Sequence, residues 1–243
     1  MAAQRAVSIT HDPFERGGWP FSEDAEPRSD GSAGHAGADI AEELWVELLR
    51  EGLTFDLAGL APGRTNPFPA IRHRFDLDAT PASAAFEGIQ LVPGQHLAGG
   101  ERSVPVVMGL IGLARDIVHH FEELAAVVWP PSASAIGRRY FESISTAWLD
   151  GGAFPALGLT AFRETEEGAL QSEGLGFWID QEIRIEPPVA TDKVAATRLG
   201  VRLVNQLILV GGVEQAERIV APDGTPLVMR PSRNGKFVQV WRE

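Results

Sequence analysis

The fold class follows from the C-terminal stretch of residues 226–241, which reads PLVMRPSRNGKFVQVW. Two extended runs flank Asn234-Gly235, and Asn-Gly between extended runs is the strongest short-range signal for a β-hairpin. Pro222-Asp223-Gly224 supplies an earlier turn, and residues 213–220 before it are also extended. The tail therefore predicts a β-meander of three antiparallel strands.

Two long helices are predicted before the meander. Ser103 is a suitable N-cap for a helix that runs to about Phe121, because Pro105 is tolerated in a first turn. The apolar residues of this helix recur at helical spacing: Val107, Leu110, Ile111, Ala114 and Val118. Thr191 is predicted to cap the second helix, which ends at about Val210 before two glycines. Its apolar face should contain Val194, Val201, Val204 and Ile208.

Further segments predict shorter elements. Asp39 can cap a helix that ends at Gly52, with apolar residues at helical spacing: Ala41, Leu44, Trp45, Leu48 and Leu49. Ser132 or Ser134 opens another helix that carries Ile136, Tyr140, Ile144, Ala147 and Trp148 on one side. Strands are predicted at residues 7–10, at Phe55 and Leu57, and at residues 71–77, 86–92, 125–129, 155–164 and 177–185.

Strands mixed with separate helices predict an α+β fold, with a mainly antiparallel sheet, helices packed on one face and a C-terminal β-meander. A strict alternation of strand and helix is missing, which argues against Rossmann and TIM-barrel architectures. Residues 29–37, which read SDGSAGHAG, are too poor in apolar side chains to order themselves. We therefore predict a flexible N-terminal arm over residues 1–38 and a single α+β domain over residues 39–243.

The chain is acidic and contains no cysteine. Its 243 residues include 21 Lys and Arg against 33 Asp and Glu, a formal net charge of −12. A field of this sign repels nucleic-acid phosphates and anionic lipids, so we predict no nucleic-acid and no membrane binding and favour a basic protein partner. The missing cysteines exclude disulfides and cysteine nucleophiles and suit a reducing compartment. No secretory signal is visible, so a cytoplasmic location is expected.

The candidate binding residues lie in the predicted strand 177–185. Apolar residues alternate there with Trp178, Asp180, Glu182 and Arg184, as in a half-buried antiparallel strand. Asp180 and Glu182 would then share one face and could act as an acid/base pair. A solvated sheet face flanked by Arg184 explains the same residues and is the favoured interpretation. Trp178 would lie on the polar side, which makes it the best candidate for a half-exposed interface anchor.

No motif specifies a reaction. Residues 94–100 are rich in glycine but lack the Gly-Lys-Ser/Thr ending of a phosphate loop, and the nucleophile elbow Gly-x-Ser-x-Gly does not occur. His119 and His120 are the only clustered pair of metal-ligand type, but adjacent side chains on a helix point about 100° apart and suit one ion poorly. A solvated helix end explains them better. We predict no metal site and no cofactor.

Residues 106–187 have a layout that resembles a known family. A helix is followed by an apolar strand ending in Val128-Trp129, a second helix ending before Phe154-Pro155, and then Gly174-Leu175-Gly176-Phe177 leading into Gln181-Glu182-Ile183. This layout resembles a bacterial domain family known only as a domain of unknown function. The resemblance implies an α+β fold and no catalytic residues. Some such domains accompany toxin–immunity or secretion loci, which by analogy favours a binding role.

Two functions from different classes follow. The first is a non-catalytic protein-binding module, immunity-like or accessory, whose candidate binding residues are Trp178, Asp180, Glu182 and Arg184. The second is a small-molecule hydrolase that uses the carboxylate pair Asp180 and Glu182, or His119 and His120. A homodimer is compatible with either function, through an exposed sheet edge or the face that carries Trp178.

Overall fold

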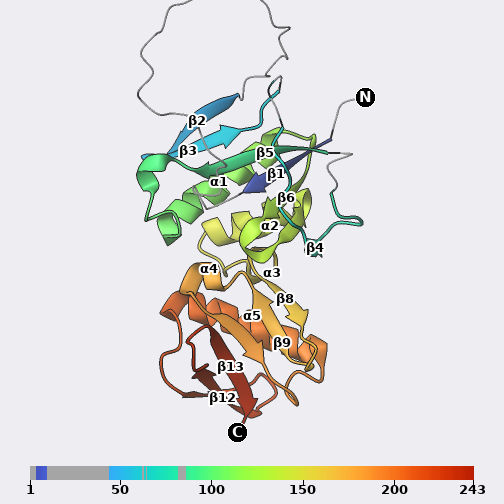
Figure 1. The fold of residues 1–243 in the computed structure, drawn as a ribbon, viewed down its shortest axis with the longest axis vertical. Helices are drawn as coiled ribbons and strands as arrows, with labels where there is room; N and C mark the ends of the chain where they lie inside the picture. Colours follow the sequence, from blue (N-terminus) through green and yellow to red (C-terminus); the bar gives the residue numbers. More distant parts are fainter. Residues whose placement is uncertain (1–3, 10–43, 62, 64, 82–85) are drawn as a thin grey trace, which may run out of the picture.

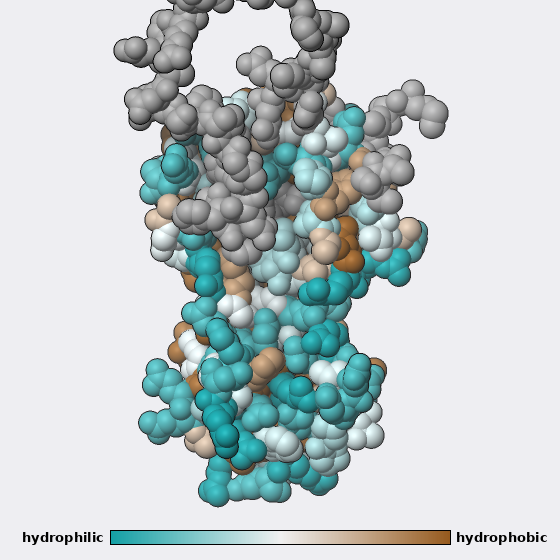
Figure 2. All heavy atoms as spheres, viewed as in Figure 1, coloured by the Kyte–Doolittle hydropathy of each residue, from teal (hydrophilic) through white to brown (hydrophobic). Residues whose placement is uncertain are grey.

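The computed structural model of the protein describes residues 44–61, 63, 65–81 and 86–243, together with the strand formed by residues 4–9. The chain forms two sheets, one above the other in Figure 1, and each sheet has helices packed against it. We call the seven-stranded sheet with its helices the first lobe, and the six-stranded sheet with its helix the second lobe. The molecule narrows between the lobes (Figure 2). The fold is α+β, as predicted.

The first lobe is built on a mixed sheet. Its strands, in order across the sheet, are β2 (Trp45–Arg50), β3 (Leu53–Ala58), β5 (Phe86–Pro93), β1 (Gln4–Ile9), β6 (Leu124–Trp129), β7 (Ser134–Gly137) and β4 (His73–Phe75). β1 pairs in parallel with β5 and β6, and β4 pairs in parallel with β7. The other neighbours are antiparallel. β2 and β4 are therefore the two edges of this sheet.

Two helices cover one face of the first sheet, and the short 3-10 helix η2 (Gln95–Leu97) precedes them. α1 (Val104–His120) packs against β3 and β5, while α2 (Arg138–Leu149) packs against β6, β7 and α1. Ser103 is the N-cap residue of α1, as predicted. The predicted apolar stripe is confirmed, because all five of its residues are buried: Val107, Leu110, Ile111, Ala114 and Val118.

The second lobe contains the predicted meander. Its strands, in order, are β11 (Glu217–Val220), β12 (Pro226–Pro231), β13 (Phe237–Arg242), β10 (Glu182–Ile185), β9 (Leu170–Glu173) and β8 (Ala161–Glu164). All neighbours are antiparallel except β10 and β13. The three C-terminal strands form the predicted antiparallel meander.

α5 (Lys193–Val210) packs against β9 and β10 and ends at Val210, as predicted, with Gly211 as its C-cap. Its N-cap is Asp192 rather than Thr191, because the Asp192 carboxylate accepts hydrogen bonds from the N–H groups of Val194 and Ala195. The predicted apolar face is shifted: Val194 is exposed, while the buried residues are Ala196, Leu199, Gly200, Leu203, Val204 and Leu207. Among the described residues, no helix is long and apolar enough to cross a lipid bilayer.

The predicted helix around Trp45 is wrong over the residues that the structure describes, because β2 and β3 form a β-hairpin. Arg50 pairs with Leu53, so Glu51 and Gly52 form a two-residue turn. Both turn residues have positive φ angles, 52° and 81°, which is the backbone geometry that matches the twist of paired strands. Gly52 therefore closes a hairpin turn instead of ending a helix. Residues 39–43 of the predicted helix lie outside the described residues.

Two other predicted boundaries are wrong. The helix expected from Ser132 or Ser134 begins at Arg138, because the residues before it form β7 against β6. Gly137 permits this path, since a Cβ atom there would lie 2.1 Å from the carbonyl oxygen of Asp76. The strand expected over residues 155–164 is confined to β8, because α3 (Ala156–Leu159) is an irregular turn in which Gly158 has a φ angle of 117°.

Part of the predicted N-terminal arm belongs to the first sheet. Gln4–Ile9 forms β1 between β5 and β6, which agrees with the short strand expected at residues 7–10. The rest of the arm, including residues 29–37, lies outside the described residues.

Candidate functional site

The two lobes meet at a junction that we call the waist. It consists of residues 72–75, residues 129–134 with the 3-10 helix η3 (Pro130–Ser132), Trp148, and residues 154–159 and 170–179. The buried apolar side chains of both lobes form one continuous core. Five aromatic rings at the waist pack with centroid separations of 4.9 to 6.3 Å: Trp129, Trp148, Phe154, Phe177 and Trp178. Aromatic pairs in this range stabilise a junction beyond the area that they bury.

Trp178, the predicted interface anchor, is half-buried among these rings. It contacts the rings of Trp129, Trp148, Phe154 and Phe177. The contacts of this side chain are therefore mainly internal to the protein. Its role in binding a partner stays a prediction.

The strand predicted over residues 177–185 is wrong in its first half. α4 (Gly176–Ile179) occupies that half, Asp180 has a left-handed φ angle of 61°, and β10 begins at Glu182. Asp180 and Glu182 therefore do not share a strand face. The Asp180 side chain is 79% exposed and accepts a hydrogen bond of 3.0 Å from Nη2 of Arg102. Arg102 also donates to two carbonyl oxygens of α4 and so closes its C-terminal end.

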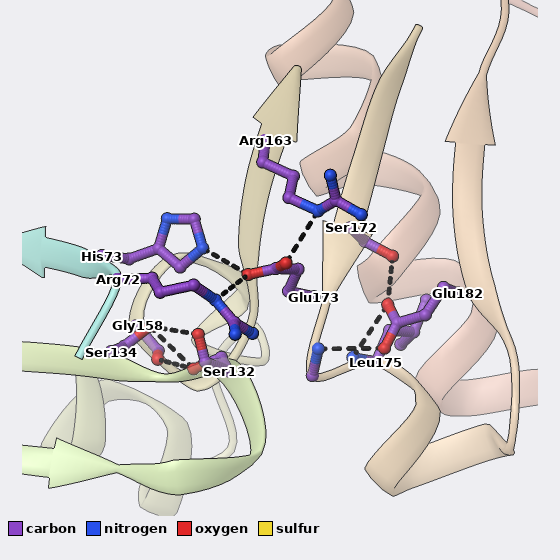
Figure 3. Close-up of polar contacts among 11 residues, drawn as sticks. Arg72, His73, Ser132, Ser134, Gly158, Arg163, Ser172, Glu173, Leu175 and Glu182 are labelled. Carbon is purple, nitrogen blue, oxygen red and sulfur yellow. Dashed lines mark hydrogen bonds and ion pairs between the residues drawn. The ribbon is translucent and has the colours of Figure 1, made fainter. Parts of the chain in front are cut away.

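Glu182 is turned toward the loop that precedes α4 (Figure 3). Its Oε1 accepts hydrogen bonds of 2.9 Å from the backbone N–H groups of Gly174 and Gly176. Its Oε2 accepts from the Ser172 hydroxyl at 2.5 Å and from the Leu175 N–H at 3.3 Å. Charge-assisted bonds of this kind are stronger than bonds between neutral groups. Glu182 thus fixes the loop, and both of its oxygens are occupied.

A second carboxylate, that of Glu173 at the end of β9, joins the two lobes (Figure 3). Its Oε2 lies 2.6 Å from Nε2 of His73 and 3.3 Å from Nε of Arg72, both of which belong to the first lobe. Its Oε1 lies 2.8 Å from Nε of Arg163 on β8. The Glu173 side chain is only 13% exposed. The contacts with Arg72 and His73 therefore cross the waist and hold a mostly buried carboxylate, while the side chain of Arg72 itself is 62% exposed.

The electrostatics of Glu173 reflect this setting. Burial alone would raise the pKa of its carboxyl group, because it disfavours the charged form. The hydrogen bond with His73 and the charges of Arg72, His73 and Arg163 outweigh burial and hold the pKa below its ordinary value. The carboxylate is therefore ionised throughout the neutral range.

The sequence prediction missed this cluster. Arg72, His73 and Arg74 form a basic run in an acidic chain, which is the one local signal. Nothing in the spacing connects this run with Glu173, which lies 100 residues beyond His73. Only the packing of the two lobes brings them together.

The pair of Glu173 and His73 resembles two members of a catalytic triad. In such a triad a carboxylate orients a histidine, and the second ring nitrogen of that histidine bonds a nucleophilic hydroxyl. In the part of the chain that the structure describes, no hydroxyl bonds that nitrogen of His73. Ser132 and Ser134 instead bond one another, and Ser132 also donates to the carbonyl oxygen of Gly158 (Figure 3).

Arg184, the fourth predicted binding residue, follows Glu182 on β10. Its Nε lies 2.9 Å from Glu186, and its Nη2 lies 3.2 Å from Glu167. Of the four predicted binding residues, the structure therefore places only Glu182 and Arg184 on one strand. Arg184 makes its ion pairs, and Glu182 its hydrogen bonds, with other residues of the protein.

The two histidines of the alternative prediction lie at the exposed C-terminal end of α1. Nδ1 of His119 lies 3.3 Å from Glu142, and Nδ1 of His120 lies 2.8 Å from the carbonyl oxygen of Asp116. Among the described residues, no group of three or more potential metal ligands is found.

The edge strand β2 carries a compact set of exposed apolar side chains. Leu44, just before β2, and Trp45, Val46 and Leu49 within it are all exposed, Trp45 by 48% and Leu49 by 72% of the whole residue's reference area. We call these four residues together with Glu47 the β2 surface. In the described part of the chain, β2 pairs only with β3, so its outer edge has no strand partner. Unpaired edges that carry exposed apolar residues are sites of strand addition and association.

Comparison of the chain with known protein families, with curated proteins and with solved structures finds no match. The resemblance of residues 106–187 to a bacterial domain of unknown function stays a prediction.

Proposed function

We propose that this chain is a non-catalytic protein-binding module, immunity-like or accessory in kind. One observation carries the proposal: the β2 surface combines four exposed apolar side chains with a strand edge that has no partner among the described residues. An extended segment of a partner can add to such an edge through main-chain hydrogen bonds, while the side chains provide selectivity. Trp45 and Leu49 lie four residues apart on the same face of β2 and are the central contacts in this proposal.

The partner that fits this surface is a basic protein with exposed apolar residues. Glu47 lies between the exposed apolar residues of β2, and Glu51 is exposed in the turn that follows. The net charge of −12 extends this local field over the molecule. Such a field accelerates association with a basic partner and is screened by salt. The absence of cysteine from the sequence supports a cytoplasmic setting for the complex.

The alternative proposal, a small-molecule hydrolase, has less support. The oxygens of Glu182 are engaged by backbone N–H groups and the Ser172 hydroxyl. Asp180 is exposed, and His119 and His120 lie on the surface at the end of α1. No observation brings any of these groups together around a substrate-sized hollow.

The proposal is tested by introducing a positive charge into the β2 surface. Partners cross-linked to the native protein are compared with those cross-linked to Leu49→Arg, and size-exclusion with light scattering records self-association. We expect Leu49→Arg to lose a basic partner that the native protein captures, because it places a cation at the centre of the surface. Leu209→Arg is the matched control, since Leu209 is a leucine on α5 that is 85% exposed.

Three results would count against the proposal. Equal capture of the partner by Leu49→Arg and the native protein would remove the β2 surface from binding. Loss of the partner in Leu209→Arg alone would move the interface to α5. A dimer that only Leu49→Arg dissociates, with no basic partner, would show that this edge serves self-association.

A further inference from the structure

A hollow of about 560 Å³ lies at the waist, beside the edge strand β4. One side is cationic, because Arg72, His73 and Arg74 line it in succession. The remaining wall is mostly apolar and comes from both lobes: Phe75, Leu77, Leu157, Phe162 and Leu170, with Thr197 of α5. A hollow of this volume, with cationic side chains on one side and apolar side chains on the other, has the features of a site for a small amphipathic molecule.

The cationic side retains unused hydrogen-bond donors. Arg72 contacts Glu173 through Nε, and Arg74 donates through Nη1 to the carbonyl oxygen of Asp78. Both Nη atoms of Arg72 and Nη2 of Arg74 make no hydrogen bond within the described residues. A guanidinium group that presents parallel N–H groups matches a carboxylate in a bidentate geometry.

The local charge favours an anion even though the protein is acidic. Two arginines line the hollow, Arg72 and Arg74, and no carboxylate of a described residue lines it; Glu173 beside it is shared between Arg72 and Arg163. The low pKa of Glu173 keeps its charge constant at neutral pH. Two arginines suit one carboxylate better than a polyphosphate.

A second hollow differs from the waist hollow in the charge of its lining. It has a volume of about 670 Å³ and lies between the start of α5 and the turn that joins β11 to β12. Its charged residues balance, with Asp192 and Asp223 against Arg198 and Arg242. The Asp192 carboxylate already occupies the N-terminal N–H groups of α5. This hollow has an apolar floor but no excess of positive charge.

We propose that the waist hollow binds a small organic carboxylate with an apolar body. The carboxylate would be held by Arg72 and Arg74, and the apolar body would lie against Leu157, Phe162 and Leu170. Because residues of both lobes line the hollow, a bound ligand would contact both. This site is separate from the β2 surface, so failure of one proposal leaves the other standing.

The experiment measures the affinity of benzoate by saturation-transfer NMR titration, with uncharged benzamide and inorganic sulfate as comparison ligands. We expect benzoate to saturate, and benzamide and sulfate each to bind at least about tenfold more weakly, because each lacks one of the two matched features. Arg72→Gln and Arg74→Gln should each weaken benzoate about tenfold. Arg242→Gln, which removes an arginine from the other hollow, should leave the affinity unchanged.

Two further variants keep the test decisive if a change at Arg72 disturbs the ion pairs of Glu173. Arg74 does not contact Glu173, so Arg74→Gln removes charge without touching that cluster. Thr197→Phe should abolish binding by filling the hollow, while unfolding curves confirm that the variant is folded. Failure of benzoate to saturate the native protein would overturn the proposal. Unchanged affinity in Arg74→Gln and Thr197→Phe, or loss in Arg242→Gln alone, would overturn it as well.

Discussion

At the scale of single residues, the two glutamates of the waist have different roles. Glu182 binds backbone N–H groups of a loop next to it in sequence, whereas Glu173 binds basic side chains from the other lobe. Both are carboxylates with several partners, and neither is recognisable as such from its neighbours in the chain. Each one leads to a separate prediction.

Replacement of Glu182 should be among the more destabilising single changes in the protein. Glu182→Ala leaves the N–H groups of Gly174 and Gly176 without an acceptor, and buried unsatisfied donors cost about 1–3 kcal/mol each. We expect the free energy of unfolding to fall by about 3 kcal/mol in urea titrations. The exposed Glu166 is the control, and Glu166→Ala should change stability by no more than about 0.5 kcal/mol. An equally small effect at Glu182 would contradict the role assigned to it.

Glu173 should make stability depend on pH in the acid range. Because its pKa in the folded protein is lower than in the unfolded chain, its ionised form stabilises the fold at neutral pH. This contribution is fully present above the ordinary glutamate pKa of about 4.3 and is lost as pH falls through the lower folded value. The difference in unfolding free energy between the native protein and Glu173→Gln should therefore shrink as pH drops below about 4. A difference that stays constant from pH 7 to pH 3 would exclude this linkage.

The residue scale also shows why the site prediction was incomplete. Trp178, Asp180, Glu182 and Arg184 alternate with apolar residues as a strand would, and period two was the only pattern available. The Glu182 carboxylate captures the loop N–H groups and Asp180 takes a left-handed conformation, so the chain turns where the pattern predicts a straight strand. A hydrogen bond from a side chain to backbone groups, as made by Glu182, does not change the order of apolar and polar residues along the chain.

At the scale of elements, predictions held where a pattern was long and well capped. α1 has 17 residues, a suitable N-cap and a complete apolar stripe, and it was predicted almost to its ends. β2 has six residues whose spacing satisfies a helix as well as a strand. The decisive feature was the turn Glu51-Gly52, which the helix interpretation took as a C-terminal stop. The turn next to a short segment therefore determines whether that segment forms a helix or a strand.

α5 packs so closely on β8 that a glycine is required. A Cβ atom on Gly200 would lie 2.6 Å from the ring of Phe162. Alanine in place of a helical glycine normally stabilises by about 1 kcal/mol, but overpacking costs about 1–3 kcal/mol. We expect Gly200→Ala to lower the unfolding free energy, measured by denaturant titration, by about 1 kcal/mol.

A smaller side chain at position 162 provides the control. In a Phe162→Leu background, Gly200→Ala should be neutral or stabilising, because the ring that it would meet is gone. A stabilising effect of Gly200→Ala in the native background would show that the ring yields without cost.

At the scale of the whole molecule, the waist could not be predicted from the sequence. It depends on Arg72 and His73 meeting Glu173, and on Trp129 and Trp148 meeting Trp178. The sequence predicts the class of the fold and the C-terminal meander, because turn residues and periodicity are local. The way in which the two sheets pack against each other depends on contacts between segments that are distant in the sequence. For the same reason, the division into two sheets was not visible from the sequence.

The continuous core predicts how the molecule unfolds. Because buried residues of both lobes belong to one cluster, we expect a single cooperative transition in which far-UV circular dichroism and tryptophan fluorescence have the same midpoint. Trp178→Leu, which removes rings from the waist, should lower both midpoints together. Two separated transitions would show that the lobes fold independently and would contradict the single domain predicted for residues 39–243.

The position of β1 has a consequence for how the protein is made. Gln4–Ile9 leaves the ribosome before the other described strands, yet its two neighbours in the sheet are β5 and β6, which follow much later. The central strands of the first sheet, β5, β1 and β6, therefore cannot all pair until Trp129 has been translated. Parallel pairing between strands that are distant in the sequence is also slow. During that interval the apolar strands made earlier have no finished sheet to join, and unpaired apolar strands are prone to aggregation. The second lobe, whose strands are nearer neighbours in sequence, can assemble with much less delay.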